Sequence, residues 1–222
     1  MTYKFDFGAL LPYWELLLQG CWLTLWLASI SMVFGLCLGL IVVLGKRSRF
    51  RPVRFIATAY IEITRNTPFL VQVLFIFFGL PSVGITLTSW TAAILALTLN
   101  LGAFSAEIIR GGVNAIPRGL FEAGAALGLS PFKTFRHVVL KPALRIIFPA
   151  LSGQFVLLLL TTSIVSSISA EELTSVSQTV DTTTFRSFEV FVVATLLYFG
   201  MSMLFSLVFK MINRVYFSYP IK

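Results

Sequence analysis

The chain has 222 residues, of which 57% are hydrophobic and only 12% are charged, and its formal net charge is +8. Soluble globular domains carry about 25% charged residues, and a globule of this length has too little interior to hide so much apolar surface. The composition therefore argues against a soluble enzyme, a disordered chain and a nucleic-acid-binding domain. Together with a mean hydropathy of +0.91, it predicts a polytopic membrane protein built from helices.

The sequence offers few residues for metal binding or catalysis. His137 is the single histidine, so we expect no histidine-based metal site. Cys21 and Cys37 lie in one apolar run, too far apart along a helix for a disulfide, and are expected to be packing residues. The nearest approach to a P-loop, Gly45–Arg47, lacks the upstream glycine and the following Ser or Thr. We therefore predict no cofactor in this chain and no ATP-binding motif.

Apolar runs divide the chain into five predicted membrane spans. The segment over 1–20 contains Asp6 and Glu15 and is predicted to lie at the outer surface, with Asp6–Gln19 as an interfacial helix. Cys21–Leu44 has no charge and is too long for the apolar part of a signal peptide. The turn composition of Pro81–Gly84 divides the next uncharged stretch in two. Within a transmembrane domain over 21–213, followed by a tail over 214–222, the predicted spans are 21–44, 53–80, 88–109, 146–170 and 190–209.

The basic residues predict how the spans are oriented. If the N-terminus is outside, the outer segments hold only Lys4 and Arg186, and Arg65 lies at membrane depth. Because Lys and Arg collect on the cytoplasmic side, this distribution favours an N-terminus outside and a C-terminus inside. The inner segments would then hold Lys46, Arg47, Arg49, Arg51, Arg54, Arg110, Arg118, Lys133, Arg136, Lys141, Arg145, Lys210, Arg214 and Lys222.

The inner segment between the third and fourth spans is patterned like a docking loop. Glu122–Gly128 is predicted to form a short helix that ends on a glycine, which can take a left-handed turn. Ser130 and Pro131 are typical of the N-cap and first position of a second helix. Two short helices at an angle would form a knob for another protein to grip. The apolar face of the second helix would be formed by Phe132, Phe135, Val138 and Val139.

This loop resembles the EAA loop of importer-type ABC permeases, in which Glu-Ala-Ala is followed by a glycine and then by Ile-x-Leu-Pro. Three further segments resemble the polar amino-acid subfamily: 62–68 with Gln72, 106–119, and 171–173 after a fourth span rich in Ser and Thr. The chain is thus identified as similar to permease subunits of polar amino-acid importers over about 5–217. The loop positions that match are Glu122, Ala123, Gly124, Gly128, Val138 and Leu140.

The resemblance implies an all-α membrane helix bundle with five spans and a cytoplasmic coupling loop over about 117–142. It implies two ATP-binding subunits on the cytoplasmic side, which would bind ATP and Mg, a second permease subunit, identical or paralogous, and an extracytoplasmic binding protein. Glu122 would meet a basic residue of the ATP-binding subunit, and Gly128 would set the angle between the loop helices. The substrate would be a polar amino acid, and the location the lipid bilayer of the bacterial inner membrane, with no role for nucleic acid.

The sequence departs from the family pattern at several positions. The third position of the EAA motif is Gly124 instead of alanine, which is expected to loosen that turn slightly. The loop proline, Pro142, comes one residue late, with Lys141 in its place. In the fourth span, Leu160 and Thr161 stand where the subfamily often has Lys and Asp or Asn. The expected fold is unaffected, but substrate contacts cannot be carried over at that pair.

Two charged residues are predicted at membrane depth in the second span. Glu62 and Arg65 are three positions apart on one helix face, where they can pair. Pro68 removes a backbone hydrogen bond and kinks the helix. A kinked helix bearing Arg65, Asn66 and Thr67 is a candidate site for the α-carboxylate of an amino acid. A structural Glu62–Arg65 pair that locks two helices is the alternative, and the sequence favours neither.

Hydroxyl side chains crowd the predicted outer half of the fourth span. Hydroxyls line pores and also let helices pack closely, and their density favours a cavity lining. Asn100 is a buried polar candidate of the same kind in the third span, whereas Glu107 and Arg110 are expected to anchor the inner end of that span. The candidate substrate pathway therefore comprises Glu62, Arg65, Asn66, Thr67, Asn100, Thr161, Thr162, Ser163 and Ser166.

Two other classes of function compete with an importer subunit that works by alternating access. A self-sufficient secondary carrier or channel would move solute without ATPase subunits and usually shows internal repeats, and five spans do not divide evenly. An integral-membrane enzyme would need a catalytic set facing one compartment. One histidine and the lack of a carboxylate dyad argue against the enzyme, so the importer subunit remains the leading interpretation.

Overall fold

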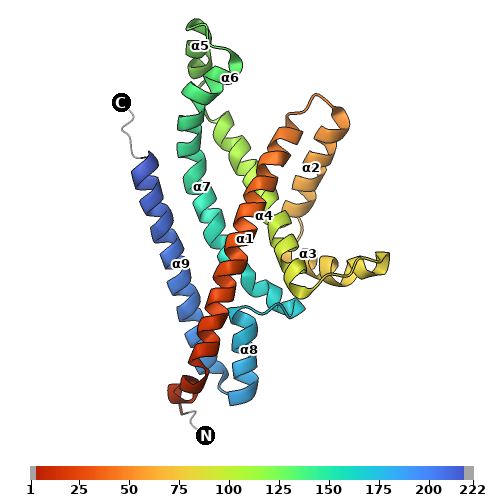
Figure 1. Ribbon diagram of the computed structural model, residues 1–222, viewed down its shortest axis with the longest axis vertical. Coiled ribbons are helices and arrows are strands. Elements are labelled where there is room, and N and C mark those ends of the chain that lie inside the picture. The colour runs from red at the N-terminus through yellow and green to blue at the C-terminus, as the bar shows by residue number, and fades with distance from the viewer. Residues whose placement is uncertain (1–3, 218–222) are drawn as a thin grey trace.

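A computed structural model describes residues 4–217, which form an elongated bundle of helices (Figure 1). Every regular element within this range is helical. The long helices are α1 (Trp14–Lys46), α4 (Ser89–Asn114), α7 (Leu140–Thr161) and α9 (Ser187–Phe217). The shorter elements are η1 (Phe7–Tyr13), α2 (Arg51–Arg65), α3 (Phe69–Leu74), η2 (Phe75–Gly79), η3 (Leu80–Val83), α5 (Arg118–Ala126), α6 (Pro131–Thr134), η4 (Phe135–Val139), η5 (Thr162–Ile168) and α8 (Leu173–Thr184).

Among the described residues, four helical stretches are long and apolar enough to cross a membrane, and a bent pair makes a fifth crossing if it is counted as one span. The four stretches contain most of the spans predicted over 21–44, 88–109, 146–170 and 190–209. The span predicted over 53–80 is not one helix, because α2 and the helical segment Phe69–Val83 are bent by 113°. Pro68 explains the break, since it has no N–H to donate and forces extended backbone on the residue before it.

The first crossing begins earlier than the sequence predicted. The segment over Asp6–Gln19 was expected to lie along the surface, but η1 leads directly into α1, and the two form one apolar stretch, Phe7–Lys46. Leu10 and Leu17 on this stretch are buried. Asp6 accepts a hydrogen bond from the backbone N–H of Gly8 and so caps η1. Tertiary burial of the leucines therefore outweighs the local preference of these residues for an interface.

The core of the bundle is the contact between α1 and α4, where small residues let the two backbones approach closely. A Cβ atom on Gly39 would lie only 2.7 Å from Cβ of Ser105 and 3.2 Å from the backbone nitrogen of Ala106. Leu27 on α1 and Leu97 on α4 are fully buried in the same cluster of apolar side chains. Close helix packing through small residues is the usual solution in membrane proteins.

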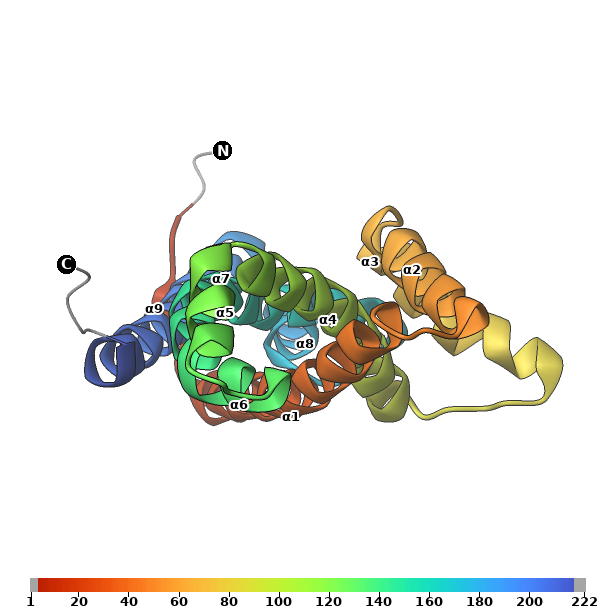
Figure 2. The same cartoon turned by 90° about the horizontal axis from the view of Figure 1, so that it is seen from above.

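The other helices are arranged around this pair. Figure 1 places α5 and α6 at one end of the long axis and α8 with the start of α1 at the other. Seen along that axis, α9 and the α2–α3 pair lie on opposite flanks, with α4 and α7 between them (Figure 2). The α2–α3 elbow therefore stands on one flank of the α1–α4 core.

The loop between α4 and α7 forms the expected projection, here called the α5–α6 knob (118–139). Gly128 has φ of +70°, which confirms the left-handed turn after the first helix. Ser130 accepts from the backbone N–H of Lys133 as the N-cap, and Pro131 follows in the first turn. The second helix was expected to be a separate short helix. It is not, because α6 continues through η4 into α7. The knob is thus rigidly joined to a crossing helix.

Packing explains the glycine at the third position of the EAA-like motif. A Cβ atom on Gly124 would lie 2.3 Å from Cγ2 and 2.6 Å from Oγ1 of Thr134. No side chain fits between α5 and α6 at this point. The glycine was expected to loosen the turn, but it lets the two helices of the knob meet closely.

Candidate functional site

A cluster of four charged side chains joins α1, α2 and α4. Glu107 on α4 accepts from Lys46 Nζ at 2.7 Å and from Arg110 Nη2 at 2.6 Å, and Arg65 Nη1 lies 4.0 Å from its Oε2 atom. The side chain of Glu107 is 16% exposed, against 40% for Arg65 and for Arg110. Three cations therefore share one carboxylate, which leaves the cluster with an excess of positive charge. Glu107 and Arg110 pair at the inner end of α4, as expected, and Lys46 and Arg65 are two further partners of the carboxylate.

The pairing of Glu62 with Arg65 considered from the sequence is wrong. Within residues 4–217 these two side chains form no ion pair, and the guanidinium of Arg65 turns to Glu107 and lies 5.4 Å from the ring centroid of Phe104. Glu62 is exposed and accepts from Asn66 Nδ2 at 3.3 Å. Although the two residues share one side of α2, packing against α4 draws the arginine inward and leaves the glutamate outside.

The end of α2 is closed by polar side chains from both sides of the bend. Asn66 Nδ2 donates to the carbonyl of Glu62 at 2.8 Å, and Thr67 Oγ1 donates to the carbonyl of Ile63 at 2.8 Å. Asn66 and Thr67, which were candidates for substrate binding, thus act first as caps of their own helix. Carbonyls left without partners at a helix end need such caps.

Gln72 holds the bend between α2 and α3, and sequence reasoning named it only as part of a resemblance. Its Nε2 atom donates to the carbonyl of Thr64 at 2.7 Å and to Oγ1 of Thr67 at 2.8 Å. Its Oε1 atom accepts from Asn100 Nδ2 at 3.3 Å, which ties the bend to α4. The sequence predicted the kink at Pro68, and the signal that could have found Gln72 is that a helix end broken by proline requires a donor for its free carbonyls. Asn100 is therefore a support of the elbow in this structure.

The hydroxyls predicted to line a cavity hydrogen-bond mainly to their own helix. Thr161, Thr162, Ser163 and Ser166 each donate to a backbone carbonyl three or four residues earlier. Thr162 is fully buried. Ser163 borders a cavity of about 400 Å³ between the α7–η5 stretch and α9, whose lining is Leu160, Ser163, Thr195, Tyr198, Phe199 and Ser202. Of the predicted hydroxyls, Ser163 is the one that borders this cavity.

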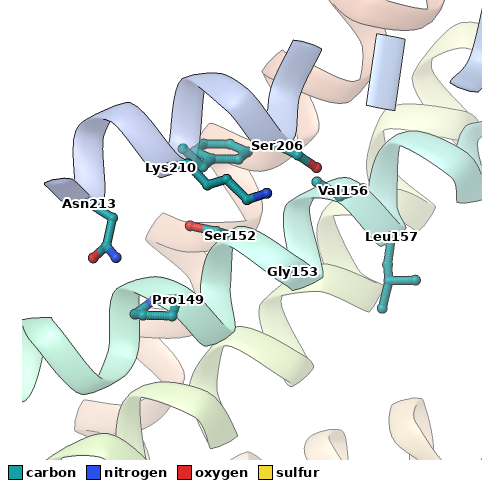
Figure 3. A pocket seen from close by; sticks show the side chains of 9 residues that line it. Pro149, Ser152, Gly153, Val156, Leu157, Ser206, Lys210 and Asn213 are labelled. Atoms are coloured by element: carbon teal, nitrogen blue, oxygen red, sulfur yellow. The ribbon is translucent and has the colours of Figure 1, made fainter. Parts of the chain in front are cut away.

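A second cavity of about 360 Å³ follows along the same pair of helices, on the side of the α5–α6 knob. Lys210 on α9 lies across from Ser152 on α7, Ser206 lies nearer Val156, and the lysine side chain extends into the space between the helices (Figure 3). Leu157 in the lining of this cavity is one helical turn from Leu160 in the lining of the first cavity. The two cavities therefore lie in line along α7. Together they are called the α7–α9 groove. The groove offers hydroxyls along its length and one cation at one end.

Glu172 forms a buried polar cluster at the opposite end of the molecule from the knob. It is fully buried, caps α8 by accepting from the backbone N–H of Ser175 at 2.9 Å, and accepts from the hydroxyl of Tyr198. The next residue, Leu173, donates its N–H to Thr24 Oγ1 at 3.0 Å, which fixes α8 to α1. Burial raises the pKa of the Glu172 carboxyl above its ordinary value. Because Tyr198 also lines the groove, this cluster supports one groove wall.

The family of binding-protein-dependent transport system inner membrane components has a model that matches residues 24–217 of this chain. The glutamine transport system permease protein GlnP of Escherichia coli strain K12 is 34% identical over 213 residues, which cover 95% of this chain and 97% of that protein. The L-cystine transport system permease protein TcyB of Bacillus subtilis strain 168 is 34% identical over 91% of this chain and 87% of that protein.

Solved structures show the same architecture. A chain of the crystal structure of an amino acid ABC transporter with histidines is 34% identical and superposes with a TM-score of 0.90, covering 96% of this chain and 99% of that one. An inward-facing structure of the MetNI methionine ABC transporter, at 24% identity and a TM-score of 0.78 over 92% of this chain and 98% of that one, shares the fold.

Proposed function

The chain belongs to the family of binding-protein-dependent transport system inner membrane components, and we propose that it is the permease subunit of an ATP-driven importer of polar amino acids. The observation that carries the proposal is end-to-end similarity, because a glutamine permease protein matches 95% of this chain at 34% identity. The location is the bacterial inner membrane, where apolar helices of this length span. The N-terminus would face outward and the C-terminus inward, as the basic residues predict.

The α5–α6 knob would transmit the work of two ATP-binding subunits, which bind ATP and Mg. Glu122 and Ala123 are exposed on α5, and Leu127 and Phe132 of the same knob are 75% and 74% exposed. An exposed carboxylate with large apolar neighbours suits a protein contact. Gly128 provides the turn, and the half-buried Val138 in η4 and Leu140 at the start of α7 lie where the knob continues into the crossing helix. Movement of the knob would therefore be passed along α7 to the groove.

The α7–α9 groove would form this subunit's part of an alternating-access pathway, completed by a second permease subunit. Its lining supplies hydroxyls from Ser152, Ser163, Ser202 and Ser206, which suit a polar solute. Leu160 borders the groove where relatives often carry a charge, so this wall would recognise the amino acid through neutral groups. An extracytoplasmic binding protein would deliver the substrate to the outer end.

Reconstitution tests this proposal against a self-sufficient carrier or channel. We expect proteoliposomes that contain this chain, its second permease subunit, the ATP-binding subunits and the binding protein to accumulate radiolabelled glutamine, cystine, arginine or histidine only with ATP. Liposomes that hold this chain alone provide the comparison. Uptake by the chain alone, or ATP-independent uptake by the complex, would replace the importer with the carrier. If the complex takes up none of the amino acids in a broad panel when ATP is present, the assigned substrate class is wrong.

A further inference from the structure

The turn between α1 and α2 exposes four arginines without partners. Arg47, Arg49, Arg51 and Arg54 are all exposed, and within residues 4–217 none of their side chains forms an ion pair or a hydrogen bond. The neighbouring Lys46, in contrast, is committed to Glu107. We call these four residues the α1–α2 arginine cluster. No acidic residue lies between Lys46 and Arg54, so the positive charge of the turn is uncompensated locally.

Large apolar side chains alternate with these arginines on the surface. Phe50 and Phe55 are each 73% exposed, and Ile56 is 66% exposed. Three large apolar side chains exposed to water would not stabilise the turn. A surface that mixes guanidinium groups with exposed aromatic and aliphatic side chains is typical of a segment at the boundary between lipid headgroups and acyl chains.

The position of two arginines on α2 points to an external anion. Arg51 and Arg54 lie at the start of α2, where the helix dipole is positive and where cations are unfavourable. The first turn contains no acidic residue, and Phe50 as N-cap provides no side-chain acceptor. Nothing within the described chain offsets this repulsion. An anion placed against the turn would interact with the guanidinium groups and with the free N–H groups of the helix start.

The level of the cluster in the molecule favours lipid over the ATP-binding subunits. In Figure 1 the α1–α2 turn lies at the same end as the α5–α6 knob, but the knob projects beyond it along the long axis. The turn lies close to the ends of the crossing helices α1 and α4. With the orientation proposed above, that level is the inner surface of the membrane, where the headgroups of the inner leaflet are found.

We propose that the α1–α2 arginine cluster binds the phosphate groups of anionic phospholipids in the inner leaflet. Guanidinium groups match phosphate oxygens in paired hydrogen bonds, and Phe50 and Phe55 enter the acyl region beside them. The bound lipid fixes the level at which α2 starts, and therefore the position of the elbow held by Gln72 at the other end of α2. This binding is independent of the substrate and of ATP.

A lipid titration of the assembled transporter tests the proposal. The complex is stripped of lipid in detergent, and its affinity for phosphatidylglycerol and for phosphatidylcholine is measured by native mass spectrometry. We expect a preference for phosphatidylglycerol that salt weakens. The variant R51Q/R54Q should lose about fivefold in affinity for each arginine removed, since each basic residue at the surface contributes about that factor. The charge-conserving R51K/R54K should keep most of the preference.

The control is R214Q, which removes one exposed arginine charge from the corresponding end of α9, outside the groove lining. The proposal requires that this control keep the preference for phosphatidylglycerol. Equal affinities in the wild type and R51Q/R54Q, or a loss in R214Q equal to that for one arginine of the cluster, would overturn it. A third result would also overturn it: unchanged lipid affinity with loss of the copurifying ATP-binding subunits, which would assign the cluster to that protein contact. Because no amino acid or ATP is added, failure here leaves the transport proposal untouched.

Discussion

Arg65 of α2 lies 4.0 Å from Glu107 of α4, measured from Nη1 to Oε2, and leaves Glu62 of its own helix without an ionic partner in the described chain. Glu107 thereby becomes the point at which α1, α2 and α4 are connected by charge, because Lys46 and Arg110 bind the same carboxylate. An interaction that two residues of one helix could have satisfied is made between helices. It fixes where α2 stands relative to the core.

Removing this carboxylate should destabilise the bundle. In Glu107→Gln, three half-exposed cations would lose their shared partner and repel one another. Because the site lies between the fully buried and the surface cases, we expect a loss of about 2 kcal/mol in the free energy of unfolding. Thermal unfolding of the purified complex, followed by tryptophan fluorescence, would measure it. Glu171→Gln, at an exposed carboxylate, should change nothing. Equal midpoints for the two variants would contradict the role of Glu107.

The sequence predicted the membrane-crossing helices correctly where a long apolar run is enough to identify them, as in α1, α4 and α9. It also predicted the turn at Gly128 and the cap at Ser130, because these depend on neighbours a few residues away. It could not predict that Arg65 turns to Glu107, since that depends on how α2 packs against α4. The burial of Glu172 was missed for a similar reason: α8 folds back on α1, so a residue in a polar stretch becomes fully buried.

Two glycines in crossing helices should respond differently to one added methyl group. In Gly39→Ala the new Cβ would lie 2.7 Å from Ser105 Cβ and 3.2 Å from backbone atoms of α4, so the α1–α4 core must shift. Overpacking of this kind costs about 1–3 kcal/mol. Gly153→Ala is the matched control, because nothing lies within 4 Å of its Cβ position and alanine favours the helix. Unfolding midpoints in detergent should fall for the first variant and stay or rise for the second.

The elbow between α2 and α3 should open when its glutamine is replaced. Gln72→Leu has a similar size but can neither donate to the carbonyl of Thr64 and to Thr67 nor accept from Asn100, and at about 1 kcal/mol for each of these three bonds the loss is about 3 kcal/mol. We expect faster hydrogen exchange over 64–72, measured by mass spectrometry, with α9 unaffected. Asn100→Ala removes one contact of 3.3 Å and should have a smaller effect. Protection unchanged in both variants would exclude a stabilising role for Gln72.

The knob offers a direct test of coupling. Glu122→Arg reverses an exposed charge that the structure uses for no internal contact within the described chain, so folding should be preserved. If Glu122 meets a basic residue of the ATP-binding subunit, placing like charges together costs several kcal/mol. ATP-driven uptake in proteoliposomes should then fall by about tenfold or more, which corresponds to at least about 1.4 kcal/mol of docking free energy. Glu171→Arg, at the other end of the molecule, is the charge-matched control. Normal uptake in Glu122→Arg would show that this contact of the knob is not needed to couple ATP hydrolysis to transport.

The buried carboxyl of Glu172 predicts how stability depends on pH. Burial raises its pKa in the folded protein, whereas in the unfolded chain the carboxyl titrates near its ordinary value of about 4.3. Between these two values the folded state binds more protons than the unfolded state, so the free energy of unfolding falls as pH rises through that window. Glu172→Gln can still cap α8 at Ser175 and contact Tyr198, but it carries no titrating group. The unfolding midpoint of Glu172→Gln should therefore change less with pH across the window than that of the wild type. The midpoint of Glu171→Gln should change with pH as the wild type's does. A wild-type curve that rises with pH where the Glu172→Gln curve is flat would reverse the sign and contradict the buried, proton-retaining state of this carboxyl.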